Sequence, residues 1–195
     1  MIHARRAGFK KTKRLYVVST EGAETEPIYF QEFRPARDST FRLKILASTT
    51  HKPHPLEVVQ RLFDYERRER PGANTEYWAV VDRDEWSLAD LSMAYELTHN
   101  RADFHIAMSY PCFELWLWLH IRPNRPFNDR RDCQTRLARE WVQFAKNRYP
   151  AAELISKAPM ACARAEEITE RASGILSSQG TQVFELVRKL SSEGT

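Results

Sequence analysis

Acidic residues follow two apolar segments of this sequence, and their types and spacing suit the binding of a divalent cation. They are Glu21 and Glu26 after the first segment, and Asp82, Asp84 and Glu85 after the second. Residues two apart in an extended chain point the same way, so Asp82 and Asp84 can present two carboxylates to one side. Crowded carboxylates repel one another unless a hard cation such as Mg²⁺ or Mn²⁺ neutralises them. Such a site is typical of phosphoryl transfer.

Acids in these places have a second interpretation, because they also cap helices and solvate loops. For the run from Asp82 to Glu85 alone, or for Glu21-Gly22 alone, this second interpretation is favoured. Both runs follow predicted strands, and ligands gather outside the carboxyl ends of parallel strands. Taken together, the two runs therefore favour a metal site.

The acids must be positioned by an alternation of strand and helix patterns. Strands are predicted at residues 15–19, 41–47, 77–81 and 104–108, and helices at 25–33, 55–68, 87–97 and 112–120. The alternation predicts an α/β fold with a mainly parallel, Rossmann-like sheet of about four strands flanked by helices on both faces. Continuous apolar runs in three of the strands indicate burial on both faces.

Residues 128–195 carry no strand signal and show three amphipathic stripes, the first formed by Leu137, Trp141, Phe144 and Ala145. We expect a helical C-terminal region at 128–195, packed on an α/β core at 15–127. Its apolar helices could also supply the face of a homo-oligomer.

The first fourteen residues form a predicted basic arm, because they contain six Lys or Arg and no Asp or Glu. The basic residues are Arg5, Arg6, Lys10, Lys11, Lys13 and Arg14. Such a run can follow the phosphates of a nucleic acid, and a solvated terminus is an equally supported alternative. Arg83 and the Arg-rich segment 122–131 are further candidates for holding a nucleic-acid backbone.

The compartment is predicted from the cysteines and from hydropathy. Cys112, Cys133 and Cys162 lack metal-ligand spacing, and three unpatterned thiols fit a reducing cytoplasm. No apolar run approaches membrane-spanning length and no signal-peptide pattern occurs at the start, so we expect a soluble cytoplasmic protein.

Two further groups have open interpretations. Glu114 is the acid in the apolar segment 112–120, where an unpaired carboxylate would be costly, so it either faces the crevice or pairs with an arginine. His51 and His54 lie in a Pro-rich loop at the same predicted edge. They could contact phosphate or transfer a proton, but loop histidines without such a role are the favoured interpretation.

Three motifs resemble the RloB-like family, a Toprim-related group associated with bacterial restriction and phage-defence loci. They are Thr20-Glu21-Gly22-Ala23-Glu24-Thr25-Glu26-Pro27-Ile28-Tyr29-Phe30, Val81-Asp82-Arg83-Asp84-Glu85 and Tyr110-Pro111-Cys112-Phe113-Glu114-Leu115-Trp116. The resemblance implies a Toprim-like core in which Glu21 acts as general acid or base or as a metal ligand. It also implies that Asp82 and Asp84 hold the metal and that Glu26 adds a ligand, with Glu85 and Glu114 as additional site residues.

The leading hypothesis is a Mg²⁺- or Mn²⁺-dependent endonuclease of DNA or RNA that acts in bacterial defence against phage or foreign DNA, with abortive infection as the associated setting. One alternative is a non-catalytic or partner-activated subunit of a complex containing an ATPase. The chain has no phosphate-binding Gly-x-x-x-x-Gly-Lys motif, so that ATPase would be a partner protein encoded nearby. Nucleotide hydrolysis at the same acids is a further alternative.

Overall fold

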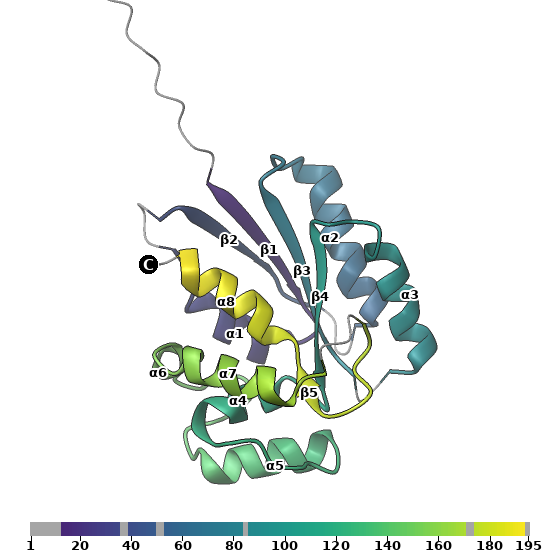
Figure 1. The fold of residues 1–195 in the computed structure, drawn as a ribbon. Helices are drawn as coiled ribbons and strands as arrows, with labels where there is room; N and C mark the ends of the chain where they lie inside the picture. Colours follow the sequence, from purple (N-terminus) through teal and green to yellow (C-terminus); the bar gives the residue numbers. More distant parts are fainter. Residues whose placement is uncertain (1–12, 36–38, 50–52, 84–85, 171–173, 194–195) are drawn as a thin grey trace, which may run out of the picture.

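A computed structural model describes residues 13–35, 39–49, 53–83, 86–170 and 174–193. Within these residues, five strands form one sheet in the order β2-β1-β3-β4-β5 (Figure 1). Their bounds are Arg14–Thr20 (β1), Phe41–Leu46 (β2), Thr75–Asp82 (β3), Phe104–Tyr110 (β4) and Gly180–Thr181 (β5).

The sheet is parallel in all pairings but one. Strand β1 pairs in parallel with β2 and β3, and β3 pairs in parallel with β4, whereas β5 is antiparallel to β4. The carboxyl ends of β1, β2, β3 and β4 therefore lie along one edge of the sheet. The predicted α/β class and mainly parallel topology are confirmed.

Helices cover both faces of the sheet, as the continuous apolar runs predict. Their bounds are Thr25–Gln31 (α1), Pro55–Glu69 (α2), Leu88–Thr98 (α3), Glu114–Ile121 (α4), Arg130–Glu140 (α5), Ala152–Ile155 (α6), Ala158–Ile168 (α7) and Val183–Glu193 (α8). Leu15 and Val17 of β1 pack toward α2 and α3, whereas Tyr16 and Val18 join the cluster formed with α1, α4, α7 and α8. This division follows the alternation of side chains along a strand.

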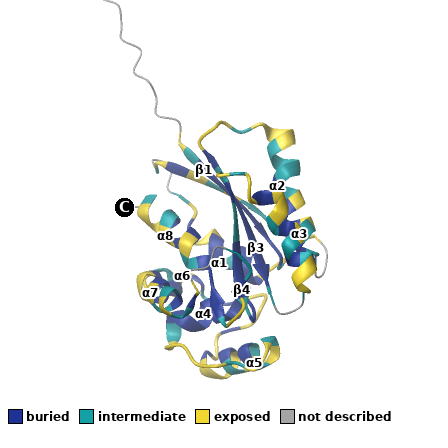
Figure 2. Cartoon of the chain, turned by 45° about the vertical axis from the view of Figure 1, so that its right-hand side comes forward, coloured by how far each residue is buried: buried dark blue, intermediate teal, exposed yellow. Residues whose placement is uncertain are grey.

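Helix α4 is the most deeply buried helix of the C-terminal half. All of its residues from Glu114 to His120 are buried (Figure 2). Its apolar side chains belong to the same hydrophobic cluster as buried residues of α5, α7 and α8. The helices after residue 128 therefore cover α4 and one face of the sheet.

Two details of the C-terminal region differ from the prediction. The expected helical stripe is interrupted, because α5 ends at Glu140 and a turn follows in which Ala145 bridges Arg148. Trp141 and Phe144 are still buried, stacked on each other with ring centroids 5.9 Å apart. Strand β5 was not predicted, because two residues are too short to give a periodic signal.

A buried hydrogen bond joins α1 to α4 beneath the sheet. The imidazole of His120 lies 2.9 Å from the Trp116 carbonyl through Nδ1 and 3.1 Å from the Tyr29 hydroxyl through Nε2. Burial lowers the pKa of His120 to about 4. The ring is therefore neutral, with Nδ1 donating to Trp116 and Nε2 accepting from Tyr29.

We predict that Tyr29→Phe lowers the free energy of unfolding by about 1–3 kcal/mol, because it leaves the buried His120 acceptor unpaired. Tyr16→Phe is the matched control, since its hydroxyl donates over 3.4 Å to Glu193, a partly exposed side chain that water can reach. Urea unfolding of both variants measures the difference, and an equal loss in the two would contradict the role of the His120 bond.

Candidate functional site

A cavity of about 290 Å³ lies at the carboxyl edge of the sheet. We call it the acid pocket. Five acids line it, of which Glu21, Glu26, Asp82 and Glu114 are at most 5% exposed, whereas Glu24 is exposed. Glu21 directly follows β1, and Asp82 is the last residue of β3. Glu26 and Glu114 lie in the first turns of α1 and α4. The topology thus brings four buried acids from three separate segments of the sequence into one cavity.

Glu21 and Asp82 are joined by the pairing of their strands. The backbone N–H of Glu21 donates to the Val80 carbonyl, which continues the β1–β3 ladder beyond Thr20. The backbone N–H of Asp82 donates to Glu21 Oε2 over 3.0 Å, and the indole N–H of Trp86 donates to the same oxygen over 3.3 Å. These two donors fix the orientation of the Glu21 carboxylate.

Asp82 uses both of its carboxylate oxygens. Oδ1 accepts from the backbone N–H of Phe113 over 2.8 Å, at the N-terminus of α4. Oδ2 accepts a hydrogen bond from the guanidinium of Arg130, with which it forms an ion pair. Both partners compensate a negative charge that burial would otherwise disfavour.

Glu26 lies against Gly22 because that residue has no side chain. The backbone N–H of Gly22 donates to Glu26 Oε1 over 2.9 Å. A Cβ at position 22 would lie 1.9 Å from Glu26 Oε2, so any larger residue would force the carboxylate to move. The Glu21-Gly22 sequence thereby supplies one acid and the space for another.

Glu114 was expected either to face the crevice or to pair with an arginine, and the structure agrees in part with each interpretation. Its carboxylate lines the acid pocket, as the functional interpretation expects. It is also paired, but with Lys146 over 3.7 Å instead of with an arginine, and it accepts from the Gln134 amide over 3.0 Å.

The carboxyl groups of the acid pocket shift the pKa values of their neighbours. Burial, and next the charge of Asp82, raise the pKa of Glu21 and that of Glu26 to about 8. Burial also raises the pKa of Asp82, to about 6, although the adjacent Arg130 opposes the rise. Clustered carboxyls with raised pKa values are common at functional sites, where a bound cation or a proton-transfer role explains them.

Other predicted site residues lie elsewhere. Arg14 opens β1 at the opposite edge of the sheet and pairs with Glu76 and Glu193 over 3.5 and 3.6 Å. Arg83 places its guanidinium 4.8 Å from the centre of the Tyr110 ring. Lys13 directly precedes β1. Several predicted residues lie outside the described part of the chain: Arg5, Arg6, Lys10, Lys11, His51, Asp84 and Glu85.

His54 has a structural role in the helical layer. Its Nδ1 accepts from the backbone N–H of Leu56 over 3.1 Å and so caps α2. Its Nε2 lies 3.1 Å from Asp90 Oδ1 in α3. These contacts tie α2 to α3 without any need for a catalytic role.

The sequence did not single out four side chains that contact the acids: Trp86, Arg130, Gln134 and Lys146. Arg130 fell within the segment 122–131, which was assigned to nucleic acid only as a whole. A helix start at Asp129, whose side chain caps α5, was the available signal. That signal would place Arg130 in the first turn of a helix, but it contains no information that the helix faces the pocket.

The acids fit a divalent cation by chemistry, since Mg²⁺ and Mn²⁺ prefer carboxylate oxygens. In the described residues, however, no three His, Cys, Asp or Glu side chains converge as a set of metal ligands. The engagement of both Asp82 oxygens by Phe113 and Arg130 is consistent with this. The chemical types of the donors therefore fit a divalent cation. In this structure, however, both oxygens of Asp82, the central acid, already accept hydrogen bonds from the protein.

Comparison with known proteins identifies a family. The family model described as RloB-like protein matches residues 16–190. No curated protein and no solved structure matches the chain. Among the described residues, every helix is too short or too polar to cross a membrane.

We predict that the metal-free protein becomes less stable as the pH rises from 4.5, the ordinary pKa of a glutamate, to about 8. In that range the two glutamates bind more protons in the folded protein than in the unfolded chain, which outweighs the opposing effect of His120, so the free energy of unfolding falls with pH. Urea unfolding at several pH values in the presence of a chelator measures the slope.

Glu21→Gln should flatten this slope, because the amide stays neutral throughout. Glu24→Gln is the matched control, since Glu24 lies at the pocket but is exposed, and we expect it to leave the slope unchanged. A wild-type slope of the opposite sign would contradict the raised pKa values.

Proposed function

Since the chain belongs to the RloB-like family, we propose that it hydrolyses phosphodiester bonds of DNA or RNA with a divalent cation bound at the acid pocket. The observation that supports this most is the burial of Glu21, Glu26, Asp82 and Glu114 in one cavity at the carboxyl edge of a parallel sheet. Such a concentration of carboxyl groups, which can ionise when a cation binds, is suited to a hard cation and to the phosphate that the cation binds.

Asp82 and Glu21 are the central ligands in this proposal, with Glu26 beside them. The next expected ligand is Asp84, which lies outside the described residues. A bound Mg²⁺ or Mn²⁺ would stabilise charge on the scissile phosphate and lower the pKa of a coordinated water.

Glu21 is placed to hold or accept a proton. Its Oε2 accepts from Asp82 N–H and the Trp86 indole, and burial raises the pKa of the carboxyl to about 8. In the metal-free pocket such a group can exchange a proton near neutral pH, and in the cation-bound site Glu21 would either share in coordination or accept a proton from the attacking water.

Cations on the rim would hold the phosphate backbone. Lys146 lines the pocket and is itself exposed, and Arg148 follows two residues later in the same turn. Within the described residues Arg148 makes no ion pair, so its charge is available to a phosphate. The basic arm would add contacts from the opposite edge of the sheet, where Arg14 begins β1.

The biological setting that we propose is defence against phage in the bacterial cytoplasm. A partner-activated subunit is the second candidate, and one observation favours it: Arg130 already engages Asp82. Arg130 would have to move away from Asp82 before a cation could bind. A partner protein, such as an ATPase encoded by a neighbouring gene, could drive this movement.

We predict that wild-type protein cleaves plasmid DNA or structured RNA in Mg²⁺ or Mn²⁺, and that a chelator abolishes cleavage. Asp82→Ala should reduce the rate by at least about 100-fold, the scale seen when a group that stabilises transition-state charge is removed. Gel electrophoresis of end-labelled substrates measures the rates.

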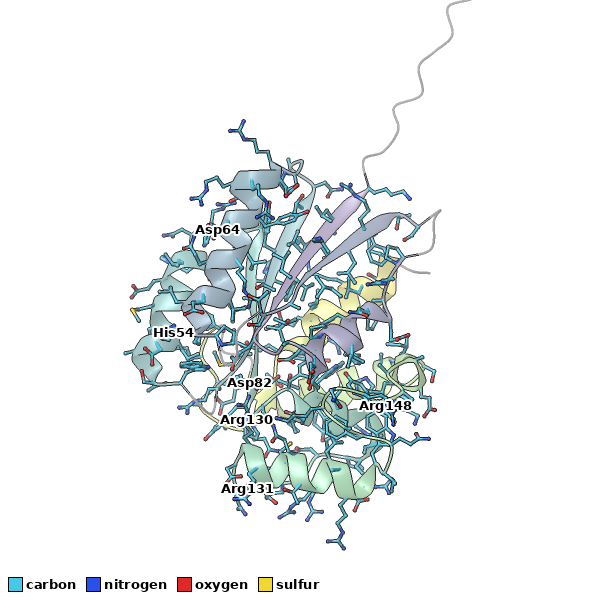
Figure 3. All side chains as sticks on the ribbon, turned by 180° about the vertical axis from the view of Figure 1, so that it is seen from behind. His54, Asp64, Asp82, Arg130, Arg131 and Arg148 are labelled. Atoms are coloured by element: carbon cyan, nitrogen blue, oxygen red, sulfur yellow. The ribbon has the colours of Figure 1, made fainter. Side chains whose placement is uncertain are left out.

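Asp64→Ala is the matched control, and it should cleave like wild type. Asp64 lies on α2 away from Asp82 (Figure 3), with a side chain that is 44% exposed and paired with Arg67. Equal activity in Asp82→Ala and Asp64→Ala would contradict the site. If wild type cleaves only after addition of the protein encoded by a neighbouring ATPase gene, the partner-activated form is correct.

A further inference from the structure

Arg130 stands at the point where α5 meets the acid pocket. It is the first residue of α5, directly after the capping Asp129, and its side chain is 21% exposed. Its guanidinium forms an ion pair with Asp82 Oδ2, and the Asp82 side chain is 5% exposed. Figure 3 shows Arg130 beside Asp82, whereas Arg131 lies on the far side of α5.

A second contact holds α5 at the pocket. Gln134 follows Arg130 by four residues, so both side chains lie on one face of the helix. Its amide donates to Glu114 Oε1 over 3.0 Å. Cys133 and Leu137 are fully buried and fix α5 against the core, in the same cluster as apolar residues of α4. The first two turns of α5 are thus joined to two of the four buried acids.

Both carboxylate oxygens of Asp82 already have a partner, and one of these partners is a cation. Oδ1 accepts from Phe113 and Oδ2 from Arg130. A planar guanidinium satisfies a carboxylate as a cation does, because it offers positive charge and directed donors together. Two cations close to the same oxygen would repel each other in a buried site.

We infer that Arg130 competes with the divalent cation for Asp82, so that the guanidinium must leave Oδ2 before metal binds. The inference rests on the proposed function, because it assumes that the acid pocket is the metal site. In the metal-free protein Arg130 offsets the charge of the buried aspartate. On binding, the cation takes over this role, and the displaced guanidinium becomes available to the phosphate of the substrate.

The test is Mn²⁺ binding to metal-free protein, measured by isothermal titration calorimetry and without any substrate. Arg130→Ala should bind Mn²⁺ at least about tenfold more tightly than wild type, because the competing charge-assisted hydrogen bond is gone. Arg131→Ala is the matched control, since Arg131 is exposed and, within the described residues, has no ion pair. Its affinity should equal that of wild type.

Asp82→Ala separates the inference from the function on which it rests. If Asp82→Ala loses Mn²⁺ binding but Arg130→Ala binds no more tightly than wild type, the competition is wrong and the metal site stands. If Asp82→Ala binds Mn²⁺ as wild type does, the acid pocket is not the metal site and both fail. Weaker binding by Arg130→Ala would also overturn the competition.

A measurement on wild type keeps the test valid if Arg130→Ala does not fold. Hydrogen exchange of the wild-type backbone should become faster in the first turn of α5 when Mn²⁺ is added, because the Arg130–Asp82 contact that holds this turn is lost. Exchange there that is unchanged or slower, in protein shown by calorimetry to have bound Mn²⁺, would overturn the inference.

Discussion

The burial of four carboxyl groups at the carboxyl edge of the sheet is the constraint on which the rest of this structure depends. Each buried carboxylate in the acid pocket would be strongly disfavoured there without compensation. The fold supplies it from several directions: the N-terminus of α4 to Asp82, the Gly22 backbone to Glu26, and the side chains of Arg130 and Lys146. The cost of ionisation that these partners do not offset appears as the raised pKa values of Glu21, Glu26 and Asp82. A protein that retains such an arrangement gives up stability, and the proposed cation site explains why.

The part of this arrangement that could be predicted from sequence follows from local patterns and one topological rule. Three apolar runs and one alternating segment predicted the four parallel strands, and acids at the ends of two of them were then expected to lie at one edge of the sheet. Pairing in register, Thr20 opposite Val80, brings Glu21 to the backbone of Asp82. Glu26 can approach Gly22 closely because glycine has no side chain. The Glu21-Gly22 motif shows the glycine, but only the structure shows that Glu26 fills the space beside it.

The part that could not be predicted depends on contacts between distant segments. Arg130 follows Asp82 by 48 residues, and Lys146 follows Glu114 by more than thirty, so no local pattern links either pair. The break after Glu140 was also hidden, because Trp141 and Phe144 keep a helical spacing while packing in a turn. That turn brings Lys146 back to the pocket, where its backbone carbonyl accepts from the Thr25 hydroxyl. Tertiary packing, and not the helical propensity of this segment, decided where the cations lie.

The nuclease and the partner-activated subunit are not independent proposals once the position of α5 is considered. This helix is joined to the acids by Arg130 and Gln134, and its outer side carries exposed residues such as Arg131 and Arg139 that the core does not use. A ligand that binds this outer side and draws the first turn of α5 outward would release Asp82 without touching the pocket. Because linkage is reciprocal, a cation bound at Asp82 would equally favour the ligand on the outer side. A nucleic acid attracted by those arginines and a partner protein with an acidic surface would therefore act on the same equilibrium, through the same contact between Arg130 and Asp82.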